Sequence, residues 1–156
     1  MILGNSSPIY PLWAFIIVAL SIILVPRKDY KYLLPHGILG TLIIAVILAV
    51  STNSVKAWKY VEIEPFSIFG ISIFILVAWG ATIIIFLWTL PLDLPDWVNY
   101  LYIALFAIIG VILDMIFHNL GLRLYASWYR SWMWFFVMYG VFWTNYKAFM
   151  IRVKKR

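Results

Sequence analysis

Long apolar stretches alternate with short polar breaks along the whole chain, and this pattern predicts five helices. The stretches cover residues 8–25, 33–52, 66–90, 98–120 and 132–150. Each is close to the roughly 20 residues that a helix needs to cross the hydrocarbon core of a bilayer. Charged residues, prolines and polar clusters separate the stretches. We therefore predict an all-α fold, a polytopic transmembrane helical bundle that forms one domain over residues 1–156.

Two of the stretches are less regular than the others. The second has an uninterrupted apolar core only over residues 42–50, so it reaches spanning length only when residues 33–40 are included. We place Pro35 in its first helical turn, where the missing N–H of proline costs nothing. A re-entrant segment is the alternative for this stretch. The third stretch would be roughly 37 Å long as a helix, so we expect it to tilt in the bilayer.

A transmembrane β-barrel is the competing architecture. The strands of such a barrel are about ten residues long and alternate between apolar and polar side chains. The run from Ile73 to Ala78 is apolar at every position. The pattern therefore favours helices over strands.

Composition excludes a water-soluble globule. The 156 residues are 65% apolar and 12% charged, against roughly 45–50% apolar and about 25% charged in an ordinary soluble domain. The chain has no cysteine, which excludes disulfides, thiolate metal sites and a cysteine nucleophile. It also lacks a G-x-S-x-G elbow, a phosphate-binding glycine loop and a dinucleotide fingerprint. We therefore expect no catalytic residues and no cofactor.

The distribution of charge predicts an orientation. The net charge is +6, but the cations lie in short gaps and in the tail, so we expect anionic lipid headgroups and no nucleic acid as partners. Alternate gaps hold eight Lys and Arg on one side and four on the other. Because Lys and Arg collect in cytoplasmic loops, the N-terminus is predicted outside and the C-terminus inside. The cations expected to meet headgroups at the cytoplasmic face are Arg152, Lys154, Lys155 and Arg156.

Asp114 is the one carboxylate predicted inside a transmembrane helix. Its insertion costs roughly 2.5–3.5 kcal/mol, so it should face protein or water and have a partner. His118 follows one turn later on the same face, within reach of a hydrogen bond or ion pair. The predicted buried stripe of this helix comprises Tyr100, Ala104, Ala107, Val111, Asp114 and His118. Residues of neighbouring helices at a similar depth, and thus possible partners of Asp114, are Ser72, Tyr10, Trp13, Trp134 and Tyr139.

Three interpretations compete for Asp114 and His118. The first is a structural clasp that fixes helix register, with Arg123 or Arg130 near its outer mouth. The second is a proton or ion relay, because a histidine beside a carboxylate exchanges protons near neutral pH. The third is a hydrolytic or metal site, which we rank last because two side chains fall short of the three protein ligands that zinc normally takes.

The segment from Ile112 through Asp114 and Gly121 to Tyr125 resembles a family of small membrane proteins of spore-forming Gram-positive bacteria. In these proteins an acidic residue late in the fourth helix precedes a Gly-Leu-x-Leu-Tyr-like stretch and an aromatic final helix. The resemblance covers the last third of the chain. It implies five helices and a bacterial plasma membrane, and no particular reaction.

These patterns lead to one expected function and two alternatives. We expect a small non-enzymatic integral membrane protein that serves as an accessory or oligomer-forming subunit. The first alternative is a small transporter or channel in which Asp114 and His118 relay protons or ions. The second alternative is a membrane enzyme that acts on lipid or isoprenoid.

Overall fold

The computed structural model describes residues 7–63 and 65–153, and these residues form five α-helices. The helices are α1 (Ile9–Leu24), α2 (Arg27–Ala49), α3 (Ile73–Trp88), α4 (Asp96–Asn119) and α5 (Met133–Val153). A short π-helical segment, η1 (Val50–Ser54), continues α2. The strands are β1 (Trp58–Tyr60), β2 (Ser67–Ile68), β3 (Ile71–Ser72) and β4 (Arg123–Tyr125). The prediction of a mainly helical fold with five helices is confirmed.

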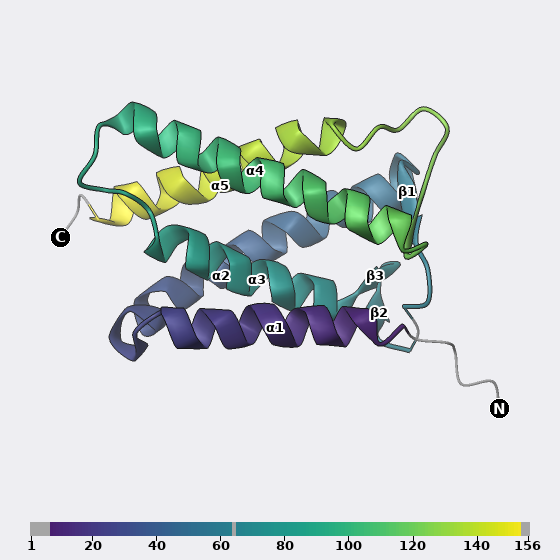
Figure 1. The fold of residues 1–156 in the computed structure, drawn as a ribbon, viewed down its shortest axis with the longest axis horizontal. Helices are drawn as coiled ribbons and strands as arrows, with labels where there is room; N and C mark the ends of the chain where they lie inside the picture. The colour runs from purple at the N-terminus through teal and green to yellow at the C-terminus, as the bar shows by residue number, and fades with distance from the viewer. Residues whose placement is uncertain (1–6, 64, 154–156) are drawn as a thin grey trace.

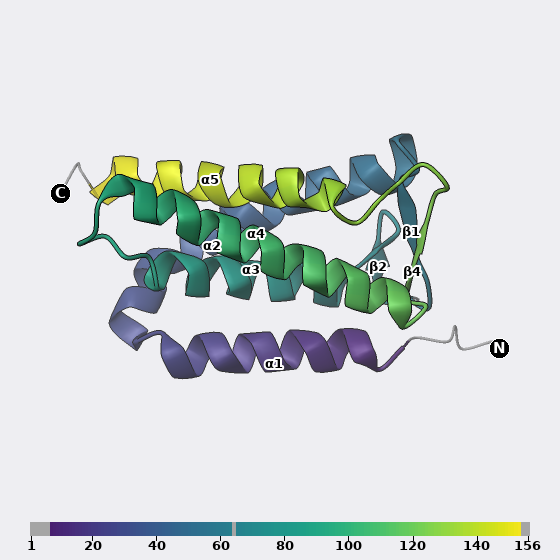
Figure 2. The same cartoon turned by 45° about the horizontal axis from the view of Figure 1, so that its top comes forward.

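The helices run up and down along one long axis (Figure 1). Helix α3 packs against both α1 and α2, and α4 packs against α5. Figure 2 shows α1 and α5 on opposite sides of the bundle, with α3 between them. The small sheets lie at the end where α1 begins and α4 ends, which we call the cap end. The α1–α2 turn, the α3–α4 loop and the last turns of α5 lie at the opposite end, which we call the basic end.

The second helix is longer than predicted. It begins at Arg27 and not at residue 33, so Pro35 lies in the helix interior and not in the first turn. In the first turns, Tyr30 and Tyr32 pack against the core, whereas Arg27, Lys28 and Lys31 remain exposed. Pro35 is exposed, so its ring displaces no packed neighbour. Together with η1, the helix runs unbroken from Arg27 to Ser54.

The third helix is shorter than predicted. It begins at Ile73 and not at residue 66, and its 16 residues are about 24 Å long instead of 37 Å. Residues 67–72 form an antiparallel hairpin in which Ser67 pairs with Ser72. The turn contains Phe69 and Gly70 with φ of 52° and 76°, and a right-handed helix cannot include such residues.

Glycines bring three of the helices into close contact. A Cβ on Gly40 of α2 would lie 2.2 Å from Ile83 Cδ1 of α3 and 2.9 Å from Asn145 Oδ1 of α5. These distances are shorter than any van der Waals contact, so a side chain at this position would have to displace the ends of the Ile83 and Asn145 side chains. In contrast, nothing lies within 4 Å of a Cβ built on Gly140 of α5.

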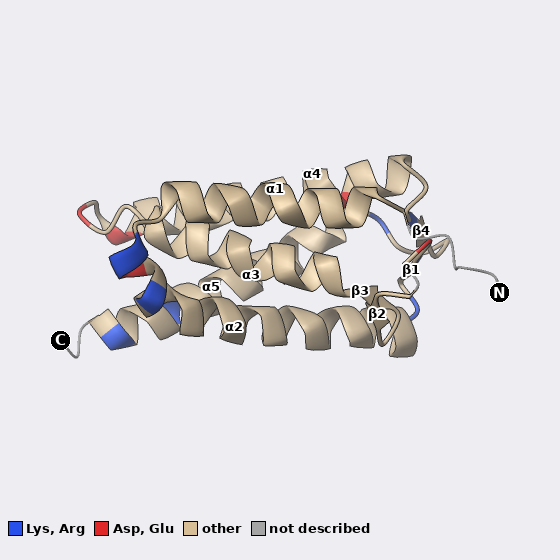
Figure 3. Ribbon diagram, turned by 90° about the horizontal axis from the view of Figure 1, so that it is seen from below, with Lys and Arg blue, Asp and Glu red and all other residues tan. Residues whose placement is uncertain are grey.

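Lys, Arg, Asp and Glu gather toward the two ends (Figure 3), and many large apolar side chains are exposed on the helices. The segments Arg27–Ser54 and Asp96–Asn119 are long and apolar enough to cross a membrane. Helices α1 and α3 are equally apolar in character, but each has only 16 residues.

Candidate functional site

The connection after α4 folds Arg123 back over the end of that helix. Gly121 has a φ of 74°, and the N–H groups of Gly121 and Leu122 donate to the carbonyls of His118 and Phe117 over 2.9 and 3.0 Å. This is the usual glycine-terminated end of a helix, and it agrees with the end of the fourth apolar stretch at residue 120. Strand β4 then pairs with β1, so that Arg123 lies opposite Tyr60.

Asp114 and Arg123 form a buried ion pair. Arg123 Nη1 donates to Asp114 Oδ1, and the exposed fractions of the two residues are only 3% and 2%. The other carboxylate oxygen, Oδ2, accepts hydrogen bonds from the hydroxyls of Tyr125 at 2.7 Å and Tyr129 at 3.3 Å. Both oxygens of Asp114 therefore have partners within the chain. Because removing one member of such a pair leaves an unpaired buried charge, each member depends strongly on the other.

Three aromatic rings surround the guanidinium of Arg123. Its Cζ lies 3.8 Å from the ring centroid of Trp58, 5.1 Å from that of Trp134 and 5.3 Å from that of Tyr60. Nε and Nη2 of Arg123 make no hydrogen bond to the described residues. The negative faces of aromatic rings attract a cation, and more so where water is excluded. The rings thus stabilise the part of the guanidinium charge that Asp114 does not contact.

The hydroxyl of Tyr125 links Asp114 to the start of α5. It donates to Asp114 Oδ2 and accepts from Ser131 Oγ at 3.0 Å. Burial, together with the neighbouring Asp114 carboxylate, raises the pKa of Tyr125 to about 12. Burial raises the pKa of Tyr129 as well, and the charge of Asp114 adds to the effect. Both phenols therefore keep their protons at neutral pH and act as donors to the carboxylate.

His118 lies apart from the carboxylate. Its Nδ1 is 2.8 Å from the backbone carbonyl oxygen of Arg123, and its ring stacks on Tyr125 with 3.9 Å between centroids. The residue is exposed, and it makes no hydrogen bond to Asp114 among the interactions of the described residues. The predicted stripe on this helix is accordingly only partly correct. The fully buried positions of α4 are Asn99, Ile103, Ala107, Gly110 and Asp114.

The residues predicted as partners of Asp114 have other contacts. The hydroxyl of Tyr10 lies 2.8 Å from the carbonyls of both Val61 and Leu122. Tyr139 is half-buried and packs on Phe135. Ser72 is buried at the start of α3, whereas Trp13 and Trp134 line the same small cavity as Asp114. The clasp interpretation predicts Arg123 near the outer mouth of the clasp. Arg123 does lie at the site, where it is the direct ion-pair partner of Asp114.

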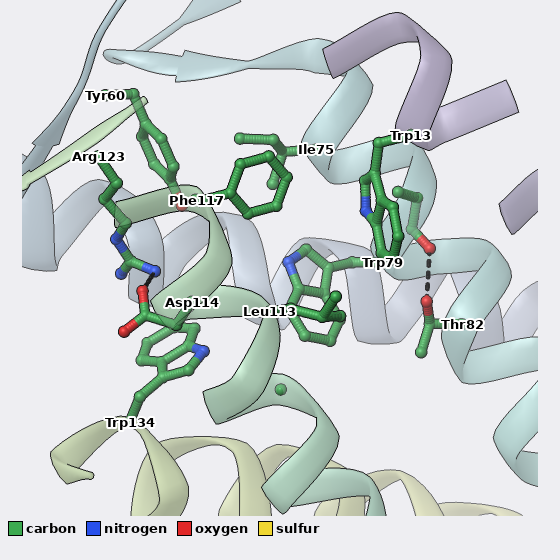
Figure 4. A pocket seen from close by; sticks show the side chains of 12 residues that line it. Trp13, Tyr60, Ile75, Trp79, Thr82, Leu113, Asp114, Phe117, Arg123 and Trp134 are labelled. Carbon is green, nitrogen blue, oxygen red and sulfur yellow. Dashed lines mark hydrogen bonds and ion pairs between the residues drawn. The ribbon is translucent and has the colours of Figure 1, made fainter. Parts of the chain in front are cut away.

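That cavity has a volume of about 30 Å³ and lies between α1, α3 and α4 (Figure 4). Trp13, Trp79, Leu113 and Phe117 form its apolar walls, and the ion pair lies at one side. A space of this size holds one or two water molecules. Toward the basic end, the bundle holds three buried polar residues, His36, Asn99 and Asn145, but most of its buried side chains are apolar. The apolar ones include Ile83, Phe86, Ile103, Met138 and Phe142.

The predicted headgroup-binding cations are only partly covered by the structure. Arg152 is exposed near the end of α5, and its Cζ lies 4.8 Å from the ring centroid of Tyr32. Lys154, Lys155 and Arg156 lie outside the described residues. In residues 7–63 and 65–153, no three His, Asp or Glu side chains are grouped so that they could hold a metal ion.

Comparison with known proteins gives no relative. The chain matches no family model, no curated protein and no solved structure.

Proposed function

We propose that the chain is an integral membrane protein with five spans in a bacterial plasma membrane, where it acts without catalysis as an accessory or oligomer-forming subunit. The observation that carries this proposal is the complete pairing of Asp114 by Arg123, Tyr125 and Tyr129. Asp114 is the one carboxylate buried among the described helices. Its contacts connect α4 to β4 and to the α4–α5 connection. We therefore assign the ion pair to structure, as a clasp that closes the cap end.

The apolar outer surface supports the transmembrane arrangement. Among the described residues, large apolar side chains that are exposed outnumber apolar side chains in the core. Monomeric soluble proteins rarely expose contiguous apolar surface of this extent. Phe15 and Ile23 of α1, both more than two-thirds exposed at 72% and 77%, are examples. In a bilayer these side chains face lipid at no cost.

The distribution of cations supports an inside location for the basic end. The first turns of α2 carry Arg27, Lys28 and Lys31, and the last turns of α5 carry Lys147 and Arg152. The C-terminal cations follow in sequence. The cap end has fewer cations: Lys56, Lys59 and Arg130, with Arg123 neutralised by Asp114. The resemblance to small membrane proteins of spore-forming bacteria is in keeping with a plasma-membrane location.

The surroundings of Asp114 favour the clasp over the two alternatives. A relay needs polar groups that continue from the carboxylate toward the other end. On α5, the apolar Met138 and Phe142 separate Trp134, which lines the cavity of Asp114, from the buried Asn145. An enzyme acting on lipid or isoprenoid needs a polar pocket that admits its substrate. The cavity beside Asp114 has room for one or two water molecules only.

The lipid-facing side of α5 supports association with a second helix. Gly140 is exposed and has open space around it, and Thr144 lies one turn further on the same face, with its hydroxyl donating back to the Gly140 carbonyl over 2.8 Å. Small residues spaced four apart allow two helices in a membrane to approach closely. Gly40 and Gly110, in contrast, face side chains within the bundle.

Oxidative cross-linking in native membranes tests this function. The chain has no cysteine, so Thr144→Cys introduces a single thiol on the proposed interface. We expect a disulfide-linked dimer with Thr144→Cys, and its loss when Gly140→Leu is added. Ile108→Cys, on the exposed side of α4, is the matched control and should give none. Monomers at every position, together with the absence of any co-purifying protein, would contradict the proposed role.

A further inference from the structure

An apolar groove runs along the lipid-facing side of the first three helices. It has a volume of about 430 Å³ and lies between α1 and α2, with α3 as its floor. The walls include Val18, Leu34, Ile38 and Leu42, and the floor includes Leu76 and Gly80. Gly80 has no side chain, and Thr41 of α2 packs directly against it, since a Cβ there would lie 2.5 Å from Thr41 Oγ1. Its lining is almost entirely aliphatic, so the groove suits a hydrocarbon chain.

A second hollow adjoins the groove at the basic end. It has a volume of about 270 Å³ and is lined by Ile22, Val25, Arg27, Tyr30 and Lys31. Tyr30 lines both hollows, so its side chain borders each of them. The hydroxyl of Tyr30 lies 3.3 Å from Ser21 Oγ of α1, which holds the ring between α1 and α2.

The charges of the second hollow are available to a ligand. Arg27 and Lys31 are exposed, and neither side chain makes an ion pair or hydrogen bond among the interactions of the described residues. They are four residues apart on α2, so they lie on the same face of the helix. Asp29 and Lys28 are close in sequence, but neither lines the hollow. The hollow thus presents two positive charges beside an apolar groove.

The length of the groove matches one leaflet of a bilayer. From Tyr30 to Leu42 on α2 the groove runs for about 18 Å at 1.5 Å per residue. Half of a hydrocarbon core of about 30 Å is about 15 Å. An acyl chain that begins at the cations would therefore lie in the groove as far as the bilayer midplane.

We propose that these two hollows form a binding site for one anionic phospholipid of the leaflet at the basic end. Its phosphate lies between Arg27 and Lys31, and one of its acyl chains lies in the groove between α1 and α2. The charges require an anionic headgroup, and the apolar groove requires a lipid rather than free phosphate. This site rests on the membrane-spanning arrangement proposed above and is separate from the C-terminal cations.

Titration of the full-length protein in detergent with lipid, followed by native mass spectrometry, tests the site. We expect phosphatidylglycerol to bind more tightly than phosphatidylcholine with the same chains. The double variant Arg27→Gln/Lys31→Gln should bind phosphatidylglycerol about twenty-five-fold more weakly, because each cation near an anionic headgroup adds a factor of about five. Lys28→Gln removes a neighbouring charge that does not line the hollow, and it should bind as the wild type does. Equal binding of both lipids, or equal losses in both variants, would overturn the proposal.

A second pair of variants tests the groove itself. Leu42→Trp places a large ring in the groove, whereas Val46→Trp places the same ring one turn further along α2, at an exposed position that does not line it. We expect Leu42→Trp to weaken phosphatidylglycerol binding at least tenfold and Val46→Trp to leave it unchanged. If Leu42→Trp instead dissociates a dimer without changing lipid binding, a second copy occupies the groove and the lipid site is wrong.

Alkaline carbonate extraction of membranes distinguishes a failure of the lipid site from a failure of the membrane-spanning arrangement on which it rests. Release of the wild-type chain from membranes would contradict the membrane-spanning arrangement, and the lipid site would fall with it. Retention in the membrane combined with no preference for phosphatidylglycerol would contradict the lipid site alone.

Discussion

The guanidinium of Arg123 lies over the indole ring of Trp58, with 3.8 Å between Cζ and the ring centroid. The contact follows from the pairing of β1 with β4, which brings residues 65 positions apart to one end of the bundle. A planar guanidinium both stacks on a ring and donates to a carboxylate, whereas a lysine ammonium is a compact, strongly hydrated charge. The position therefore requires arginine and not merely a positive charge.

Arg123→Lys tests this requirement. We expect the variant to be less stable by about 2 kcal/mol, because lysine retains a charge but loses the stacking on Trp58 and the geometry of the ion pair. Thermal unfolding in detergent, followed by circular dichroism, measures the change. Arg27→Lys, at an exposed position whose side chain makes no ion pair or hydrogen bond among the interactions of the described residues, is the control and should unfold at the wild-type temperature. An unchanged unfolding temperature for Arg123→Lys would show that only the charge matters.

The hydroxyl of Tyr125 predicts a loss of stability at alkaline pH. Its pKa rises from 10.0 to about 12 on folding, chiefly through burial. Because the folded state holds this proton more tightly than the unfolded state, the stabilising contribution is complete below pH 10 and is lost as the pH rises toward 12. Tyr125→Phe should therefore lose less stability than the wild type between pH 10 and pH 12. Denaturation at a series of pH values measures the difference, with Tyr139→Phe as the control; parallel curves for all three proteins would refute the prediction.

Gly40 and Gly140 should respond in opposite ways to the same substitution. The new methyl of Gly40→Ala would overlap Ile83 and Asn145, and overpacking of this kind costs about 1–3 kcal/mol. Gly140→Ala meets open space and replaces a glycine inside a helix, so the free energy of unfolding should stay the same or rise by up to about 1 kcal/mol. Unfolding in detergent compares the two variants. Similar losses in both would mean that α2 does not approach α3 and α5 as closely as described.

Periodicity and composition predict the helices well because apolar surface and helix coincide over most of the chain. The bounds of α1, α4 and α5 lie within three residues of those predicted from the apolar stretches. The prediction fails where the two properties separate. The polar residues 27–32 are helical, whereas the apolar residues around Phe69 and Gly70 form a hairpin because their backbone has positive φ.

The candidate site is only half predictable from the sequence. Asp114 stands out because a carboxylate in an apolar helix needs a partner. The choice of partner depends on the turn at Gly121, which reverses the chain so that Arg123, Tyr125 and Tyr129 reach back to a residue nine to fifteen positions earlier. Helical spacing favours His118 as the partner, and depth along the helices favours Tyr10 or Trp13. Both arguments miss Arg123 because they consider helices only, and Arg123 lies in strand β4, which pairs with β1 after α4 ends. A search for hydrogen-bond donors to Asp114 could have used the tyrosines that follow Gly121 as a signal.

The orientation proposed for the chain predicts which engineered thiols react from outside. Ser127→Cys lies in the exposed α4–α5 connection at the cap end, and Asp93→Cys lies in the exposed α3–α4 loop at the basic end. A membrane-impermeant maleimide added to intact cells should label Ser127→Cys and should label Asp93→Cys only after lysis. Labelling of Asp93→Cys alone in intact cells would reverse the orientation.

A double-mutant cycle across Asp114 and Arg123 tests the clasp most directly. Removal of one charge leaves the other buried and unpaired, so Asp114→Asn and Arg123→Gln should each lower the free energy of unfolding by about 3–5 kcal/mol. The double variant leaves no unpaired charge, so its loss should be smaller than the sum of the two by about 1–3 kcal/mol. Losses that add to within about 0.5 kcal/mol would mean that the two charges do not stabilise each other, and would contradict the assignment of Asp114 and Arg123 as the clasp of the cap end.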